Sequence, residues 1–310
     1  MEDIPLHRDF EILVEIFDER GEKIDDYKFH RYYQLPHVQF KNINFSKTRA
    51  RLFYPKEGQN LPAIIVLSGS DGRIEKAQNI AQLLANRGFV TLALSYFGLS
   101  GIPTHLDRIA LETVEEGVHY LISLPQVDRN RIGLYGRSKG AEMALCAASV
   151  IPNFKCLVVN SPSCAVMEGL KRFKNSGHSS WTYKGKELPF TKFSLSDFIK
   201  GKVYGRPIVH YYKNSFISIE KVKAHLLMIG TKEDEIWPAV QSIEQLKRRW
   251  QSSYSSQEYE LQTLILENSG HMLTVAYQPN NRYKKFAWQN LLADSQQSWQ
   301  ATLSFFSNYL

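Results

Sequence analysis

The feature that most constrains the fold is an alternation of continuous apolar runs with helical patterns along most of the chain. The run LPAIIVLSG (61–69) is apolar throughout, as in a strand buried on both faces of a parallel sheet. A helical pattern over 75–87, stopped by Gly88, leads to a second such run, FVTLALSYF (89–97). Because strand–helix–strand units build parallel sheets, the sequence predicts an α/β fold, with a mostly parallel central sheet and helices on both faces.

The elements expected farther along continue this alternation: helix 106–124, strand 131–136, helix 141–149, strands 154–160 and 224–230, helix 240–250, strand 259–267 and helix 298–309. Alternating polarity before the core predicts three antiparallel strands, at 10–17, 38–45 and 48–54. We therefore expect an N-terminal β extension, residues 1–58, that contributes the first strands of the sheet, followed by one main domain, 59–310.

One stretch interrupts the alternation. Between about 162 and 222 the chain is rich in Gly, Ser, Lys and aromatic residues and lacks clean periodicity. It is far longer than an ordinary connection between a strand and a helix. This stretch predicts a cap-like insertion that covers a site.

Composition limits the function classes. The net charge of +7 and the pI near 9.1 raise the question of an anionic partner. The basic residues are dispersed or form short clusters (171–174, 247–249, 282–285) without a nucleic-acid-binding motif, so we expect no nucleic-acid partner. The start MEDIPLHRDF has no signal-peptide pattern, and no apolar run approaches the roughly eighteen residues of a membrane span, which predicts a cytoplasmic protein. Three cysteines are too few for a disulfide framework and are expected to be buried thiols.

The motif GRSKG, residues 136–140, lies where an apolar strand turns into a helix. A nucleophile elbow needs an abrupt strand end, a side chain lifted above the sheet in a strained turn, and small neighbours that let strand and helix pass closely. Gly136 and Gly140 are those neighbours, and Ser138 is the predicted nucleophile. The five-residue pattern alone is common by chance, so the prediction rests on its context.

A serine hydroxyl needs a base to take its proton, and the base needs an orienting anion, in the chain order Ser, acid, His for this type of sheet. NSGHMLT places His271 just after the strand 259–267, and TKEDEIWP places acids just after the strand 224–230. The carboxyl ends of parallel strands are where open α/β sheets carry their chemistry. We predict His271 as general base and favour Asp234 as the acid, while Glu233 and Glu235 remain alternatives.

The tetrahedral oxygen also needs hydrogen-bond donors. The backbone N–H of Lys139, directly after the nucleophile, is one predicted donor. The loop SGSDG (68–72) is expected to provide the other, from the backbone N–H of Ser70. No pair of histidines has metal-ligand spacing with a carboxylate, so we expect neither a metal nor another cofactor.

From about residue 61 onward, the chain resembles the acyl-CoA thioester hydrolase and bile acid-CoA:amino acid N-acyltransferase family, in its α/β-hydrolase domain. The resemblance is carried by ordered blocks: GFVTLALSYF, LETVEEGVHYLISLPQV, IGLYGRSKGAEMALCAAS, TYKGKELP, GTKEDEIWP and SGHMLTVAYQP. It implies hydrolysis of an acyl-CoA thioester through Ser138, Asp234 and His271, and Trp237 at the end of the acid motif supports Asp234. The family's acyltransferases use a cysteine nucleophile, so the serine favours water as acceptor.

The resemblance implies an acyl-CoA substrate, and CoA carries several phosphate charges. Basic residues that could bind them are Lys171, Arg172 and Lys174 in the insertion and Arg282, Lys284 and Lys285 after the histidine loop. A carboxylesterase or dienelactone-type hydrolase of small esters is the alternative, since it would share the fold and the triad. A noncatalytic binding protein on a hydrolase fold is a third hypothesis. The sequence leaves the oligomeric state open.

Overall fold

The computed structural model describes residues 4–172, 174–254, 258–273, 275 and 286–310. Its largest feature is an eight-stranded sheet in the order β15-β14-β9-β8-β5-β6-β4-β3. The six strands from β15 to β6 are parallel, whereas β4 and β3 are antiparallel strands at one edge. This arrangement confirms the predicted α/β class with a mostly parallel sheet.

The strands of this sheet, in chain order, are β3 (Val38–Asn44), β4 (Arg49–Pro55), β5 (Leu61–Leu67), β6 (Val90–Ser95), β8 (Val127–Arg137), β9 (Cys156–Asn160), β14 (His225–Thr231) and β15 (Leu261–Leu266). The central strands are buried along nearly their whole length. Apolar residues therefore run continuously along them, which is why the sequence revealed them.

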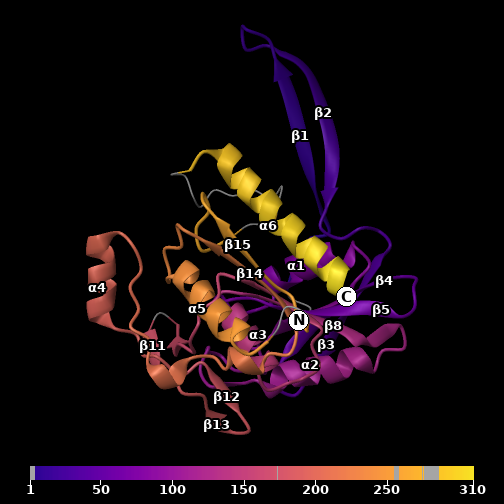
Figure 1. Ribbon diagram of the computed structural model, residues 1–310. Coiled ribbons are helices and arrows are strands. Elements are labelled where there is room, and N and C mark those ends of the chain that lie inside the picture. The colour runs from indigo at the N-terminus through magenta and orange to yellow at the C-terminus, as the bar shows by residue number, and fades with distance from the viewer. Residues whose placement is uncertain (1–3, 173, 255–257, 274, 276–285) are drawn as a thin grey trace.

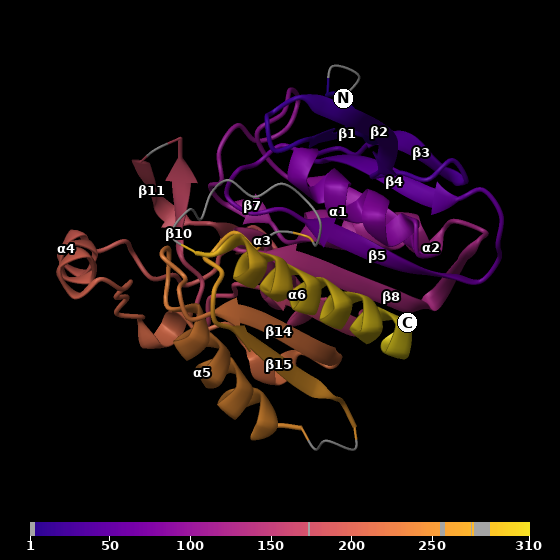
Figure 2. The same cartoon turned by 90° about the horizontal axis from the view of Figure 1, so that it is seen from above.

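Helices cover both faces of the sheet (Figures 1 and 2). One apolar cluster joins the sheet to α2 (Glu112–Ile122), α3 (Lys139–Ala148) and α5 (Ala239–Gln251). A second cluster, on the opposite face, joins it to α1 (Glu75–Ala85) and α6 (Trp288–Tyr309). All three cysteines are buried free thiols, as expected.

Two predicted helix starts were wrong. The helix expected over 106–124 begins only at Glu112, because the segment before it pairs with the insertion: the N–H of Ile109 donates to Ser180 O, and that of Leu111 donates to Thr182 O. Residues Ile109–Ala110 form the short strand β7 instead. The closing helix, expected over 298–309, begins ten residues earlier, at Trp288.

The insertion between β9 and β14 has more regular structure than its sequence suggested. Its elements are β10 (Glu168–Lys171), β11 (Lys174–Ser179), β12 (Trp181–Tyr183), β13 (Lys186–Glu187), α4 (Leu195–Tyr204) and the 3₁₀ turns η1 (Lys213–Ser215) and η2 (Ile219–Lys221). Because β9 is a parallel strand, the insertion starts at the carboxyl edge of the sheet.

The first two strands stand apart from the main sheet. β1 (Asp9–Phe17) pairs in antiparallel fashion with β2 (Lys23–Tyr32), and the two form a separate hairpin. The sequence analysis predicted β1 but not the polar β2. Of the three predicted N-terminal strands, only β3 and β4 enter the main sheet. In Figure 1 the β1–β2 hairpin extends well away from the body of the molecule.

Candidate active site

Ser138 lies in a sharp turn between β8 and α3. Its backbone angles are φ 57° and ψ −123°, a conformation that residues with a side chain rarely adopt. Gly140 packs against the backbone carbonyls of Leu67 and Ser68, and Gly136 packs against the carbonyl of Gly140. A Cβ at either glycine would collide with backbone atoms, so the close passage of strand and helix requires both glycines.

The predicted serine, histidine and acid meet in a buried chain of hydrogen bonds. The Ser138 Oγ lies 2.7 Å from His271 Nε2, and the His271 Nδ1 lies 2.8 Å from Asp234 Oδ2. Ser138, His271 and Asp234 keep only 6%, 3% and 5% of their surface exposed. An ionised Asp234 can only accept, so Nδ1 carries the proton and Nε2 is left to accept from the serine hydroxyl.

Two carboxylates of the acid loop have different hydrogen-bond partners. The other oxygen of Asp234 accepts from the backbone N–H groups of Ile236, at 2.9 Å, and Trp237, at 3.1 Å. Glu235 instead accepts from the backbone N–H of His271, at 2.9 Å. Of the three adjacent acids, Asp234 is therefore the one bonded to the imidazole, and Glu235 positions the histidine loop.

Three further side chains fix this loop, and the sequence analysis did not assign two of them. The Ser161 hydroxyl donates to His271 O at 3.1 Å, and the Trp237 ring meets the imidazole edge-on at 5.1 Å. Asp294 of α6 accepts from Asn268 N and Ser269 Oγ at 2.7 and 2.9 Å. Neither Ser161 nor Asp294 belongs to a recognisable motif, so only the fold reveals them.

The loop 68–72, predicted to help hold the oxyanion, lies against Ser138. A Cβ added to Gly69 would be 3.1 Å from the Cβ of Ser138. The buried Tyr96 hydroxyl donates to the Ser68 carbonyl at 2.6 Å, and this hydrogen bond holds the start of the loop in place. Ser70 is the exposed residue that follows, and Lys139 opens α3 beside Ser138.

A buried ion pair lies on the first turn of α3. Lys139 Nζ is 3.0 Å from both carboxylate oxygens of Glu142, and both side chains are almost fully buried. The insertion completes the cluster: Ser180 Oγ accepts from Lys139 at 2.7 Å, and Trp181 Nε1 donates to Glu142 at 2.7 Å. Burial lowers the pKa of Lys139 and raises that of Glu142. The sequence analysis considered only the backbone of Lys139.

The basic residues proposed for CoA are partly brought together. Lys171 and Lys174 pair across the β10–β11 turn, with the exposed Arg172 between them at φ 56°. Lys171 Nζ also lies 3.2 Å from Asp107. Arg282, Lys284 and Lys285 lie outside the described residues.

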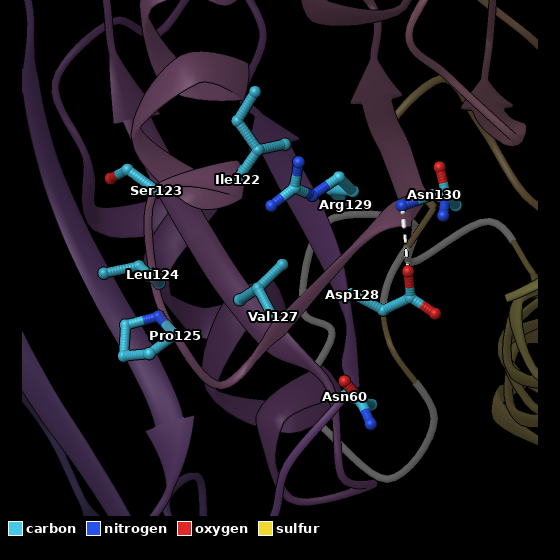
Figure 3. A pocket seen from close by; sticks show the side chains of 9 residues that line it. All are labelled: Asn60, Ile122, Ser123, Leu124, Pro125, Val127, Asp128, Arg129 and Asn130. Atoms are coloured by element: carbon cyan, nitrogen blue, oxygen red, sulfur yellow. Dashed lines mark hydrogen bonds between the residues drawn. The ribbon is translucent and has the colours of Figure 1, made fainter.

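A shallow pocket elsewhere on the molecule is separate from this site. Residues 122–125 and 127–130 line it together with Asn60, and the Asn130 N–H donates to Asp128 Oδ1 at 2.9 Å (Figure 3). It lies where β5 and β8 begin, whereas Ser138 follows the carboxyl end of β8.

Within the described part of the chain, no helix is long and apolar enough to cross a membrane.

Comparisons with known proteins match the chain to one family. A family model described as "BAAT / Acyl-CoA thioester hydrolase C terminal" matches residues 109–310. Human acyl-coenzyme A thioesterase 1 is 27% identical over 275 residues, which cover 89% of this chain and 64% of the relative. Human mitochondrial acyl-coenzyme A thioesterase 2 is 26% identical, with coverages of 89% and 56%. The chain thus spans less than two thirds of either relative.

Among solved structures, the acylaminoacyl peptidase of Pyrococcus horikoshii superposes with a TM-score of 0.58 at 16% sequence identity. The match covers 92% of this chain and 45% of the peptidase. At this identity the likeness concerns the fold alone, and it confirms the predicted α/β-hydrolase fold.

Proposed function

Because this chain belongs to the BAAT / acyl-CoA thioester hydrolase C-terminal family, we propose that it hydrolyses acyl-CoA thioesters to a free acid and CoA. The observation that carries the proposal is the unbroken hydrogen-bonded chain from Asp234 through His271 to Ser138, at a strained elbow. A noncatalytic binding protein would have no need of this arrangement.

In the first half-reaction, His271 Nε2 takes the hydroxyl proton of Ser138 as Oγ attacks the thioester carbonyl carbon. The carbonyl oxygen gains the negative charge, and the backbone N–H groups of Lys139 and Ser70 are the proposed donors to it. The C–S bond then breaks, and the CoA sulfur leaves with the proton held by His271. A thiol has a pKa of about 8.5, so its departure makes little demand on the acid.

In the second half-reaction, water attacks the acyl-serine ester while His271 takes one of its protons. The ester C–O bond breaks, and the proton returns to Ser138 Oγ. Asp234 stays ionised throughout and stabilises the imidazolium that forms twice in the cycle. The products are the carboxylic acid and the regenerated enzyme.

The same proposal assigns catalysis to residues 59–310 and gives the insertion the role of covering the site. The supporting contacts are those of Ser161 with the histidine loop and of Trp181 with α3. Lys171, Arg172 and Lys174 are the proposed contacts for the CoA phosphates, and Arg282 remains a candidate on sequence alone. The cytoplasmic location stays a prediction, since one relative is named as mitochondrial.

The test is thiol release from short, medium and long acyl-CoAs, beside matched nitrophenyl esters, with wild type and Ser138→Ala. Wild type should cleave acyl-CoA efficiently, and the variant should lose at least about 10³-fold in kcat. Ser149→Ala, at the far end of α3, is the matched control. Cleavage of the esters alone would instead support the small-ester hydrolase.

A further inference from the structure

Large apolar side chains are exposed mainly in two places. Of the sixteen large hydrophobic side chains that are exposed in the described residues, seven lie on the β1–β2 hairpin and seven lie between 193 and 212, on and around α4. Scattered single exposures are normal, but two concentrations of this kind mark surfaces that a partner covers.

One face of the hairpin is ion-paired and also carries the exposed Leu13, Phe17 and Tyr32, whereas the other face is mainly apolar. Ion pairs link the strands on the first face, including Lys28 with Glu11 at 3.2 Å and Lys23 with Glu15 at 3.0 Å. The opposite face carries a row of apolar side chains at alternate positions: Ile12, Val14 and Ile16 on β1, facing Phe29 and Tyr27 on β2. Val14, Ile16 and Tyr27 are 44%, 50% and 67% exposed. An isolated two-stranded hairpin is marginally stable in water, so this apolar face needs a cover.

Helix α4 exposes its apolar side, whereas an ordinary surface helix buries that side. Its inward side carries Asp197, which accepts from His210 N and Nδ1, and Gly201, where a Cβ would be 2.9 Å from Arg206 O. Leu195, Phe198, Ile199 and Val203 fall on the other side by helical spacing, and all are exposed. In both overall views, α4 lies at the outer edge of the molecule (Figures 1 and 2).

The two surfaces match in charge and in length. The hairpin tip, residues 18–26, has five acidic and two basic side chains, whereas residues 192–206 around α4 have four basic and one acidic. Net charges of −3 and +3 therefore accompany two apolar faces. Ile12 to Ile16 spans about 13 Å of strand, and Leu195 to Val203 spans about 12 Å of helix. Opposite charges favour this pairing over hairpin on hairpin or α4 on α4.

We propose that the chain associates with a second copy of itself, and that the apolar face of one copy's β1–β2 hairpin lies on α4 of the other. In a closed pair the contact occurs twice, because each copy offers both surfaces. Asp25, which pairs with Ile16 on the apolar face, comes near Lys202, whose ammonium lies over the Phe198 ring. The insertion over the proposed active site of one copy thereby contacts the N-terminal arm of another.

Sedimentation velocity over a wide concentration range tests this with the full chain. Wild type should associate, and both Ile16→Ser/Tyr27→Ser and Phe198→Ser/Val203→Ser should sediment as single copies. Leu13→Ser, on the ion-paired face of the hairpin, and Tyr204→Ser, off the apolar stripe of α4, are the matched controls and should associate as wild type does. Ester or thioester hydrolysis by each variant checks that it is folded.

Charge exchange provides the sharper arm of the test. Asp25→Lys and Lys202→Glu should each raise the dissociation constant about tenfold, and the chain with both changes should recover much of the loss. The proposal is overturned if wild type remains a single copy at every concentration. Binding of such a single copy to anionic lipid vesicles through α4 would not rescue it. It is equally overturned if association survives the α4 variants and is lost only with the hairpin variants.

Discussion

At the residue scale, all four polar atoms of His271 are hydrogen-bonded, to partners in three separate parts of the chain. Its two ring nitrogens face Asp234 and Ser138, its N–H donates to Glu235, and its carbonyl accepts from Ser161. A ring fixed in this way has its proton-accepting nitrogen aimed at the serine before any substrate arrives. Preorganisation of this kind lowers the cost of reaching the transition state.

The two neighbouring carboxylates should separate in kinetics. Asp234→Asn removes the charge that stabilises the imidazolium and favours the wrong tautomer, so we expect kcat to fall by about 10⁴. Glu235→Gln keeps an oxygen that can accept from the His271 N–H, so its loss should be much smaller. Steady-state hydrolysis with both variants measures the difference. Equal losses would mean that the acid was assigned wrongly.

The cysteines belong to the packing and not to the chemistry. Burial raises the pKa of the Cys164 thiol to about 11, and burial raises those of Cys146 and Cys156 as well. At pH 8, about one Cys164 in a thousand is then a thiolate. Thiol reagents should label no cysteine rapidly in the native protein and all three after unfolding, and the native rate at Cys164 should climb as the pH approaches 11. Fast stoichiometric labelling at pH 8 would contradict this.

At the scale of the elements, α3 connects Ser138 to the insertion. Its first turn contains the Lys139–Glu142 pair, which bonds Ser180, Trp181 and the backbone of Met167. Every residue of α3 is buried, so the helix lies between sheet and insertion. These contacts connect the insertion to the helix that begins directly after Ser138.

Removing one partner of this pair should be costly. Lys139→Met leaves a buried carboxylate without its cation, and we expect a loss of about 3–5 kcal/mol in the free energy of unfolding. Lys139→Met/Glu142→Gln should lose less, because a neutral amide oxygen can still accept from Trp181. Urea denaturation measures both variants.

The free energy of unfolding that Lys139→Met loses should depend on pH. Burial raises the pKa of Glu142, so above the ordinary carboxyl pKa the folded state binds more protons than the unfolded state, and stability falls as pH rises. The free energy of unfolding lost in Lys139→Met should therefore become smaller as the pH is lowered towards the raised pKa of Glu142. A deficit that grows on acidification would contradict the assignment.

The helix boundaries show what local patterns can and cannot predict. The continuous apolar runs of β5 and β6 identified buried strands directly, and Gly88, at φ 94°, marked the end of α1. Residues 109–110 were assigned to a helix because the helical pattern of residues 114–122 was extended back to 106. Their backbone groups instead bond β12, more than seventy residues away. A long-range pairing of this kind leaves no signal in a local window.

At the scale of the whole molecule, the proximity of Ser138, Asp234 and His271 was predictable because the topology of the sheet fixes where strand ends lie. Ser138, Asp234 and His271 follow three strands whose carboxyl ends share one edge, so strand order was enough to bring them together. Tyr96, Ser161 and Asp294 were missed because their roles depend on packing between distant elements. The strand β2 was missed because its sequence, KIDDYKFHRY, is mostly polar.

The most direct measurement of the central claim is intact-protein mass spectrometry after rapid mixing with an acyl-CoA and acid quenching, followed by peptide mapping. The account predicts that the protein gains one acyl group, that the group is on Ser138, and that Ser138→Ala neither gains it nor releases CoA. Turnover of acyl-CoA by Ser138→Ala at the wild-type rate would contradict it.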